Sequence, residues 1–122
     1  AANTENPEVI RILLEAGADV SARHEGLTTL MLAAANTENP EVIRILLEAG
    51  ADISTRDRVG WTVLMYASRF NDDPEVVLLL LEAGADASAQ DDDGETAWDK
   101  IQENGALENT PAYWALNDLR FE

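Results

Sequence analysis

The chain has 122 residues, enough for one domain of ordinary size, and 46% of them are apolar, so it is not a disordered tail. Cysteine is absent and His24 is the single histidine, which excludes disulfides, thiol catalysis, Ser–His catalysis and multi-histidine metal sites. The net charge is −16, so nucleic acid and anionic membranes are poor partners. The longest apolar run, from Val76 to Leu81, is too short to span a membrane.

The charge is distributed unevenly along the chain. Residues 1–70 contain 10 acidic and 6 basic residues, whereas residues 71–122 contain 14 acidic and 2 basic residues. Arg56, Arg58 and Arg69 therefore stand out as a basic group beside an acidic segment. No secretory signal peptide is visible, which weakly favours a cytoplasmic location.

An internal repeat determines the expected architecture. Residues 1–19 recur unchanged at 34–52, and a diverged copy occupies 72–86. A period of 33 to 34 residues is typical of an array in which identical units stack to bury apolar faces that none could bury alone. The unchanged copy is explained equally by recent duplication or by design, and the irregular last unit favours a natural origin. We expect four units: a partial first repeat (1–19), a second (20–53), a third (54–87) and a C-terminal capping repeat (88–122).

Each unit is predicted to contain two short helices. Thr28 and Thr62 are expected at the start of first helices that run to about residues 35 and 69. The second helices should begin at Pro40 and Pro74, each preceded by a capping Asn or Asp and followed by a glutamate. The glycines at 17, 50 and 84 should end the second helices in the left-handed conformation. In the last unit, a helix is expected over 111–119.

The motifs resemble those of the ankyrin-repeat family. They are the segment 46–53, Leu-Leu-Glu-Ala-Gly-Ala-Asp-Ile, with its two copies, and Gly-x-Thr-x-Leu at 26–30 and 60–64. The resemblance covers almost the whole chain and implies an all-α solenoid of helix pairs with β-hairpin fingers. It also implies a protein-binding scaffold that is not an enzyme and has no cofactor. The family's Thr-Pro-Leu-His reads Thr-Thr-Leu-Met at 28–31 and Thr-Val-Leu-Met at 62–65, so methionine is expected to fill the space of histidine.

In this family the fingers and first helices line a concave binding surface. Trp61 has Leu27 and Glu95 as counterparts in the neighbouring units, and we aligned Phe70 with Asn36 and Asn104. Tryptophan and arginine are the residue types richest in interface hot spots, and the third unit concentrates them. The predicted partner-binding residues are Arg56, Arg58, Val59, Trp61, Arg69, Phe70, His24, Leu27, Asn36, Asp92 and Glu95. The alternative is that Trp61 and Phe70 pack against neighbouring parts of the array.

Other conspicuous residues receive structural interpretations. The acidic run 91–95 is expected to be a solvated finger tip, because its acids do not alternate as EF-hand ligands do. Asp73 and its neighbour Asp72 should cap a helix. Trp98, Tyr113 and Trp114 are expected to pack within the last repeat rather than bind a ligand.

The leading functional hypothesis is a scaffold that binds a protein partner of unknown identity, with no metal, nucleic acid or membrane involved. The alternative is a structural spacer within a longer array. The first repeat lacks a finger and a first helix, which would leave the apolar residues at 9, 10, 13 and 14 without their usual cover. We therefore expect a monomer or a weak self-association through this end.

Overall fold

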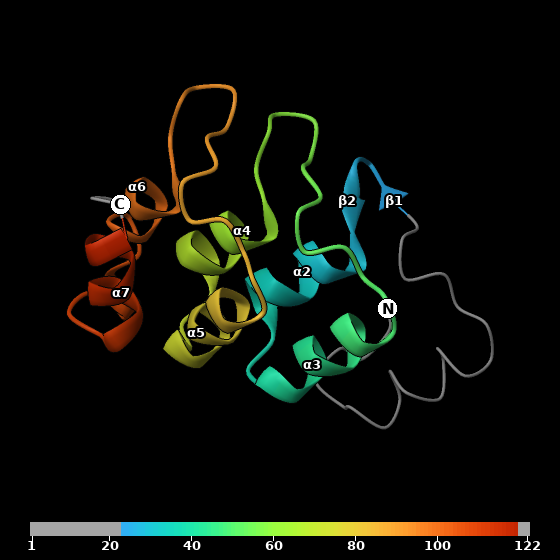
Figure 1. Cartoon of the computed structure of the whole chain (residues 1–122), viewed down its shortest axis with the longest axis horizontal. Helices are drawn as coiled ribbons and strands as arrows, with labels where there is room; N and C mark the ends of the chain where they lie inside the picture. Colours follow the sequence, from blue (N-terminus) through green and yellow to red (C-terminus); the bar gives the residue numbers. More distant parts are fainter. Residues whose placement is uncertain (1–22, 120–122) are drawn as a thin grey trace.

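The computed structural model describes residues 23–119, and the partial first repeat with its predicted self-association surface lies outside them. Three helix pairs stand side by side in chain order, and the fingers project from one side of the stack (Figure 1). The first helices form one layer and contact each other, as do the second helices in the layer below. The helices are α2 (Thr29–Asn36), α3 (Pro40–Glu48), α4 (Val63–Phe70), α5 (Pro74–Glu82), α6 (Ala97–Ile101) and α7 (Pro111–Leu119), with a 3-10 helix, η1 (Gly105–Leu107), before α7.

The helices begin where the capping residues predict. The side chains of Thr28 and Thr62 accept hydrogen bonds from the third backbone N–H of α2 and α4. Asn39 and Asp73 cap α3 and α5 through the second backbone N–H, and each is followed by a proline that has no N–H to satisfy. Gly50 and its equivalent at 84 have φ values of 99° and 101°, which confirms the predicted left-handed ends; the equivalent at 17 lies outside the described residues.

The methionines that replace the family's histidine are buried and also act as acceptors. The backbone N–H of Thr28 donates to the sulfur of Met31 at 3.5 Å, and Thr62 donates to Met65 at 3.4 Å. In the last unit Asp99 occupies this position and accepts from the backbone N–H of Thr96 at 2.8 Å. Methionine therefore fills the space as predicted and also accepts a backbone N–H at the start of its own helix.

The core lies between the two helix layers and runs continuously through the repeats. Its largest fully buried side chains include Leu30, Ile43, Leu46, Leu64, Leu80, Ile101, Leu107 and Leu116. Buried asparagines join successive repeats. The Asn71 amide donates to the carbonyls of Ala34 and Thr37 at 2.9 and 2.8 Å, and the Asn104 amide donates to those of Ser68 and Asn71 at 3.1 and 2.9 Å.

The fingers differ in how they turn. The second finger is a two-stranded hairpin of β1 (Arg23–His24) and β2 (Leu27–Thr28), joined by two residues whose φ values are both positive. The third and fourth fingers instead contain a four-residue Asp-x-x-Gly turn, at 57–60 and 91–94. The third finger has one more residue between its paired positions, Arg56 and Thr62, than the second has between Arg23 and Thr28. The aspartate that begins each longer turn organises its finger.

Neighbouring fingers are linked by hydrogen bonds to their backbone carbonyls. The Arg23 guanidinium donates to the carbonyl of Arg56 at 2.8 Å, and Arg56 in turn donates to the carbonyl of Gln90. The backbone N–H of Asp92 donates to the carbonyl of Val59 at 3.0 Å. Gly60 permits this close approach, because a Cβ there would lie 2.8 Å from the Asp92 carboxylate, and its φ is 87°.

Candidate functional site

The third finger is built around the carboxylate of Asp57. Its Oδ1 accepts the backbone N–H groups of Val59 and Trp61, at 2.9 and 2.8 Å. Its Oδ2 accepts the hydroxyl proton of Tyr66, which comes from α4. Burial of the Tyr66 ring and the hydrogen bond to Asp57 both raise the pKa of that hydroxyl, which therefore remains a donor. Asp57 thus holds the finger turn to the first helix.

Three aromatic rings gather where this finger meets α4. The ring centroid of Trp61 lies 5.2 Å from that of Tyr66 and 5.9 Å from that of Phe70. Together with Asp57 and Val59, the rings line a shallow hollow of about 250 Å³, here called the aromatic hollow. Val59 is 53% exposed and Phe70 is 50% exposed, so the rim of the hollow presents apolar surface to solvent.

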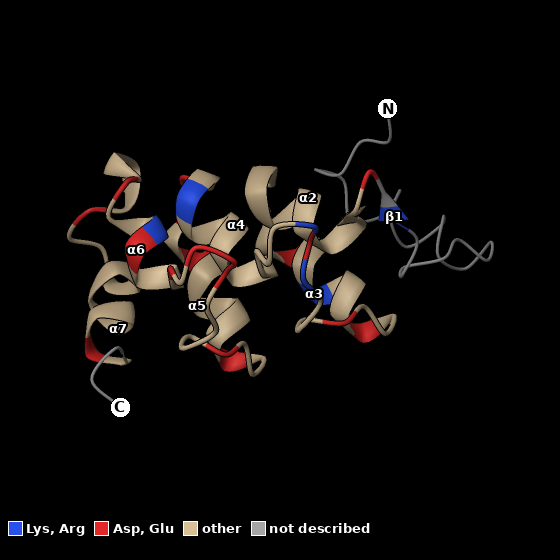
Figure 2. Cartoon of the chain, turned by 90° about the horizontal axis from the view of Figure 1, so that it is seen from above, with Lys and Arg blue, Asp and Glu red and all other residues tan. Residues whose placement is uncertain are grey.

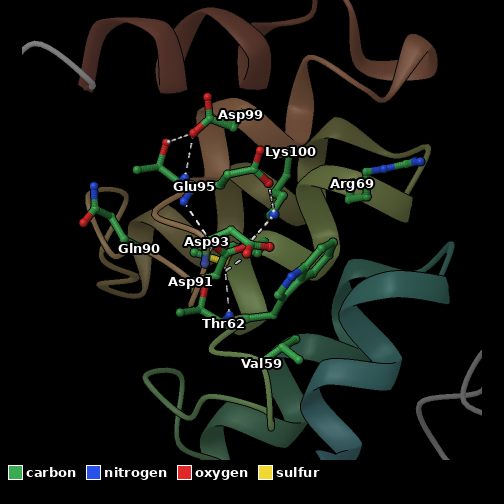
Figure 3. Close-up of polar contacts among 12 residues, drawn as sticks. Val59, Thr62, Arg69, Gln90, Asp91, Asp93, Glu95, Asp99 and Lys100 are labelled. Carbon is green, nitrogen blue, oxygen red and sulfur yellow. Dashed lines mark hydrogen bonds and ion pairs between the residues drawn. The ribbon is translucent and has the colours of Figure 1, made fainter.

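The fourth finger uses the same scaffold with different side chains. Asp91 Oδ1 accepts the backbone N–H groups of Asp93 and Glu95, each at 2.9 Å. Its Oδ2 pairs at 2.7 Å with the ammonium of Lys100, which comes from α6 and also pairs with Glu95 at 2.7 Å (Figure 3). The Lys100 and Asp91 side chains are only 4% and 1% exposed. The Lys100–Asp91 pair therefore lies inside the array, whereas the Glu95 side chain is about half exposed.

The cluster shifts both of its buried charges toward their ionised forms. Burial raises the pKa of Asp91, but the hydrogen bonds from Lys100 and from the backbone N–H groups of Glu95 and Asp93 outweigh it and hold that pKa below its usual value. Burial lowers the pKa of Lys100, but hydrogen bonds to Asp91 and Glu95 outweigh it and raise that pKa. The pair is fully charged at neutral pH.

Two cations contact the aromatic rings, Lys100 from the fourth unit and Arg69 from α4 itself. The Lys100 ammonium lies 4.2 Å from the centroid of the Trp61 ring, which fixes that ring against the next repeat. The Arg69 guanidinium lies 5.1 Å from the Phe70 centroid and pairs with Glu103 at 3.1 Å. The fourth unit therefore helps to hold the aromatic hollow in place.

A second, larger cavity adjoins the hollow at Phe70. It has a volume of about 440 Å³, and its lining includes Phe70, the polar loop at 36–37 and the carboxylate residues Glu38, Asp72 and Asp73. Asp73 caps α5, whereas Asp72 is exposed. We call this the acidic cavity. Acidic residues also dominate the turns of the array, where few basic residues are seen (Figure 2).

A family model described as ankyrin repeats, in three copies, matches residues 1–91. The chain belongs to the ankyrin-repeat family. A search of curated proteins found no match. The ankyrin assignment confirms the predicted helix-pair solenoid, whose described part is mostly helical.

The structure brings together part of the predicted ankyrin binding surface. Val59, Trp61 and Phe70 meet at the aromatic hollow, and Arg69 lies beside them. Arg58 lies away toward the second finger, where its side chain approaches Gly26. Arg56 is used in the link between fingers described above.

The remaining predicted residues lie on the neighbouring units. His24 pairs with Leu27 in the second finger, and Leu27 packs partly against the core. Asn36 borders the acidic cavity and donates to the carbonyl of Leu32 at 2.9 Å. Asp92 is exposed at the fourth finger, and Glu95 belongs to the Lys100 cluster. Partner binding through these residues stays a prediction.

One alignment made from the sequence was wrong. Asn104, aligned there with Phe70, is equivalent to Asn71, since both donate to carbonyls of the preceding repeat. The position of Phe70 is taken by Glu103 in the fourth unit. The shift arises because α6 ends at Ile101 and is shorter than α4.

Sequence reasoning missed three residues that build the site: Asp57, Tyr66 and Lys100. The recurrence of Asp-x-x-Gly at 57–60 and 91–94 was a usable signal, because an aspartate before such a turn commonly accepts its backbone N–H groups. Tyr66 and Phe70 are also four residues apart on one helix, which places them on one face.

The prediction that the acidic run 91–95 is a solvated finger tip was wrong for Asp91, which is buried, whereas Asp92 and Asp93 are exposed. Within residues 23–119, no group of three His, Cys, Asp or Glu side chains is arranged to hold a metal ion. Asp91 and Asp73 instead serve as the turn and helix caps described above. In the same part of the chain, no helix has both the length and the apolar character needed to cross a membrane.

The aromatic residues of the last unit pack on one another. The Trp98 and Tyr113 rings lie 4.9 Å apart, and Trp114 meets Tyr113 edge-on at 5.0 Å. The predicted packing within this unit is therefore observed. Trp114 remains 49% exposed, which makes it a useful comparison for Phe70.

Proposed function

We propose that this ankyrin array is a non-enzymatic scaffold that binds a protein partner through the aromatic hollow and the finger and helix residues around it. Ankyrin repeats are generally protein–protein interaction modules, which sets the class of function. We choose this surface because Phe70 and Val59 are both about half exposed there. The rings beside them are held in place, Tyr66 by Asp57 and Trp61 by Lys100. Rigid aromatic side chains at a surface are frequent binding hot spots.

The alternative is a spacer segment of a longer array that has no partner of its own. It predicts that the aromatic rings serve packing alone. Trp61 is half-buried against Lys100 and Tyr66, so it contributes to both packing and surface. Phe70 is the better probe, because half of its surface faces solvent and its removal should leave the core intact.

The test is affinity capture with the wild-type chain and two variants as bait. Phe70→Ala should lose the partner, with an affinity reduced about thirtyfold for a loss of about 2 kcal/mol. Trp114→Ala, which removes an equally exposed aromatic ring elsewhere, should retain it. Melting temperatures should be similar for the three baits. A partner set that is identical for all three baits would contradict binding through the aromatic hollow, and capture of no partner by the wild-type chain would favour the spacer.

A further inference from the structure

We propose that the partner segment carries a large apolar side chain for the aromatic hollow and lysine or arginine side chains beside it. This inference rests on the proposed function and adds the chemistry of the partner. It comes from two cavities of different character that share Phe70 as a common wall.

The aromatic hollow is suited to an apolar side chain. Its lining is formed mainly by Val59, Trp61, Tyr66 and Phe70. The Asp57 carboxylate at its edge already accepts two backbone N–H groups and the Tyr66 hydroxyl. An apolar side chain placed here would cover exposed ring surface without stripping water from a free charge.

The hollow is not an aromatic cage for a cation. The three ring centroids lie 5.2 to 6.3 Å apart, so the rings contact each other and leave no space between them for an ammonium group. Lys100 already lies over the Trp61 ring, and Arg69 over the Phe70 ring. Basic groups of a partner must therefore lie beside the hollow.

The acidic cavity is the adjoining place for those basic groups. Its lining includes the carboxylate residues Glu38, Asp72 and Asp73, and no Lys or Arg is found among the described residues that line it. A segment that places its apolar side chain against Phe70 would bring the neighbouring residues of its chain over this cavity. Lysine or arginine there would meet carboxylates at short range.

The two cations that contact the rings of the hollow are already paired with carboxylates within the array. Lys100 lies between two carboxylates, and Arg69 pairs with Glu103. The exposed acids at 92 and 93 on the next finger add further negative charge. An acidic partner segment would therefore be repelled on the side of the acidic cavity and the fourth finger, whereas a basic one would be attracted there and its association would be accelerated.

Three pools of synthetic peptides of equal length test this inference. The first pool has a central Leu, Phe or Trp flanked by Lys, Arg and Gly. The second has the same centre flanked by Asp, Glu and Gly, and the third has basic flanks around a central Gly. Each pool is titrated against the wild-type chain, Phe70→Ala, Asp72→Lys and Glu82→Lys at physiological ionic strength.

The first pool should bind most tightly, at least tenfold better than either of the others. Its binding should fall at least tenfold on Phe70→Ala and about threefold or more on Asp72→Lys. Glu82→Lys changes the net charge equally, but at the exposed end of α5, so it should have a smaller effect than Asp72→Lys. This pair separates local recognition from general attraction to an acidic protein.

The possible failures are distinguishable. If the acidic pool binds as well as the basic one and is lost on Phe70→Ala, the hollow is a docking site and only the inference about basic residues falls. Equal effects of Asp72→Lys and Glu82→Lys would overturn the acidic cavity as the basic subsite. Binding of every pool that is unchanged on Phe70→Ala would overturn both this inference and the proposed function.

Discussion

The third and fourth fingers share one turn structure, but the third presents apolar side chains and the fourth presents acidic ones. In each finger an aspartate begins a four-residue turn and accepts hydrogen bonds from the backbone N–H groups two and four residues further along. It also accepts one hydrogen bond from a side chain of the first helix. The donor from the helix is nine residues further along in both cases, the Tyr66 hydroxyl in one and the Lys100 ammonium in the other. The backbone of the two fingers is thus set by the same device.

The side chains that the two units present to solvent and to each other differ at equivalent positions. Where the third unit has Trp61 and Phe70, the fourth has Glu95 and Glu103. The first pair forms an apolar hollow, and the second pair neutralises Lys100 and Arg69. In this ankyrin array the turn of each finger is set by its aspartate and the donor from the helix, whereas the side chains at positions 61 and 95 and at 70 and 103 differ in kind. We therefore expect that the surface can change without a change of fold.

Because the fourth finger buries an ion pair where the third has a tyrosine, we expect replacement of Lys100 to lower the free energy of unfolding most. Lys100→Met would leave the Asp91 carboxylate buried without its cation, which typically costs about 3–5 kcal/mol. Urea unfolding at pH 7 should show this loss in the free energy of unfolding. A loss below about 1 kcal/mol would mean that the cluster is not a buried ion pair in solution.

The pH dependence of that loss sharpens the same prediction. The lowered pKa of Asp91 gives stability that is full above its unfolded pKa of about 3.9 and is lost as the pH falls through the folded value. The raised pKa of Lys100 gives stability that is full below about pH 10.4 and is lost as the pH rises further. The stability gap between wild type and Lys100→Met should therefore narrow below about pH 4. A gap that stays constant from pH 7 to pH 3 would contradict this.

The equivalent change in the third unit should be milder. Tyr66→Phe removes the hydroxyl donor but leaves Asp57 with its two backbone hydrogen bonds at a less buried position. We expect a loss of about 1–1.5 kcal/mol in the free energy of unfolding, measured as above. A loss as large as that of Lys100→Met would show that the two fingers do not differ in the way described.

The sequence predicted the helices well, because their ends are encoded locally. Thr62 begins α4 through its own side chain, and α7 spans the predicted 111–119. The site was predicted only in part. The pairing of Asp57 with Tyr66 depends on how the finger folds back on the helix, which the repeat period does not reveal. The misplacement of Asn104 arose where α6 is shorter than its predecessors, so a fixed period failed there.

The most direct test converts the surface of the third unit into that of the fourth. In the double variant Trp61→Glu, Phe70→Glu, Asp57 and Tyr66 still hold the finger, and the carboxylate introduced at position 61 would face the Lys100 ammonium as Glu95 does. Partner capture and thermal melting are measured on the same preparation. We expect a folded array, with a melting temperature within about 5 °C of the wild type, that no longer captures the partner. Retained capture, or unfolding of the array, would contradict the separation of scaffold and binding surface.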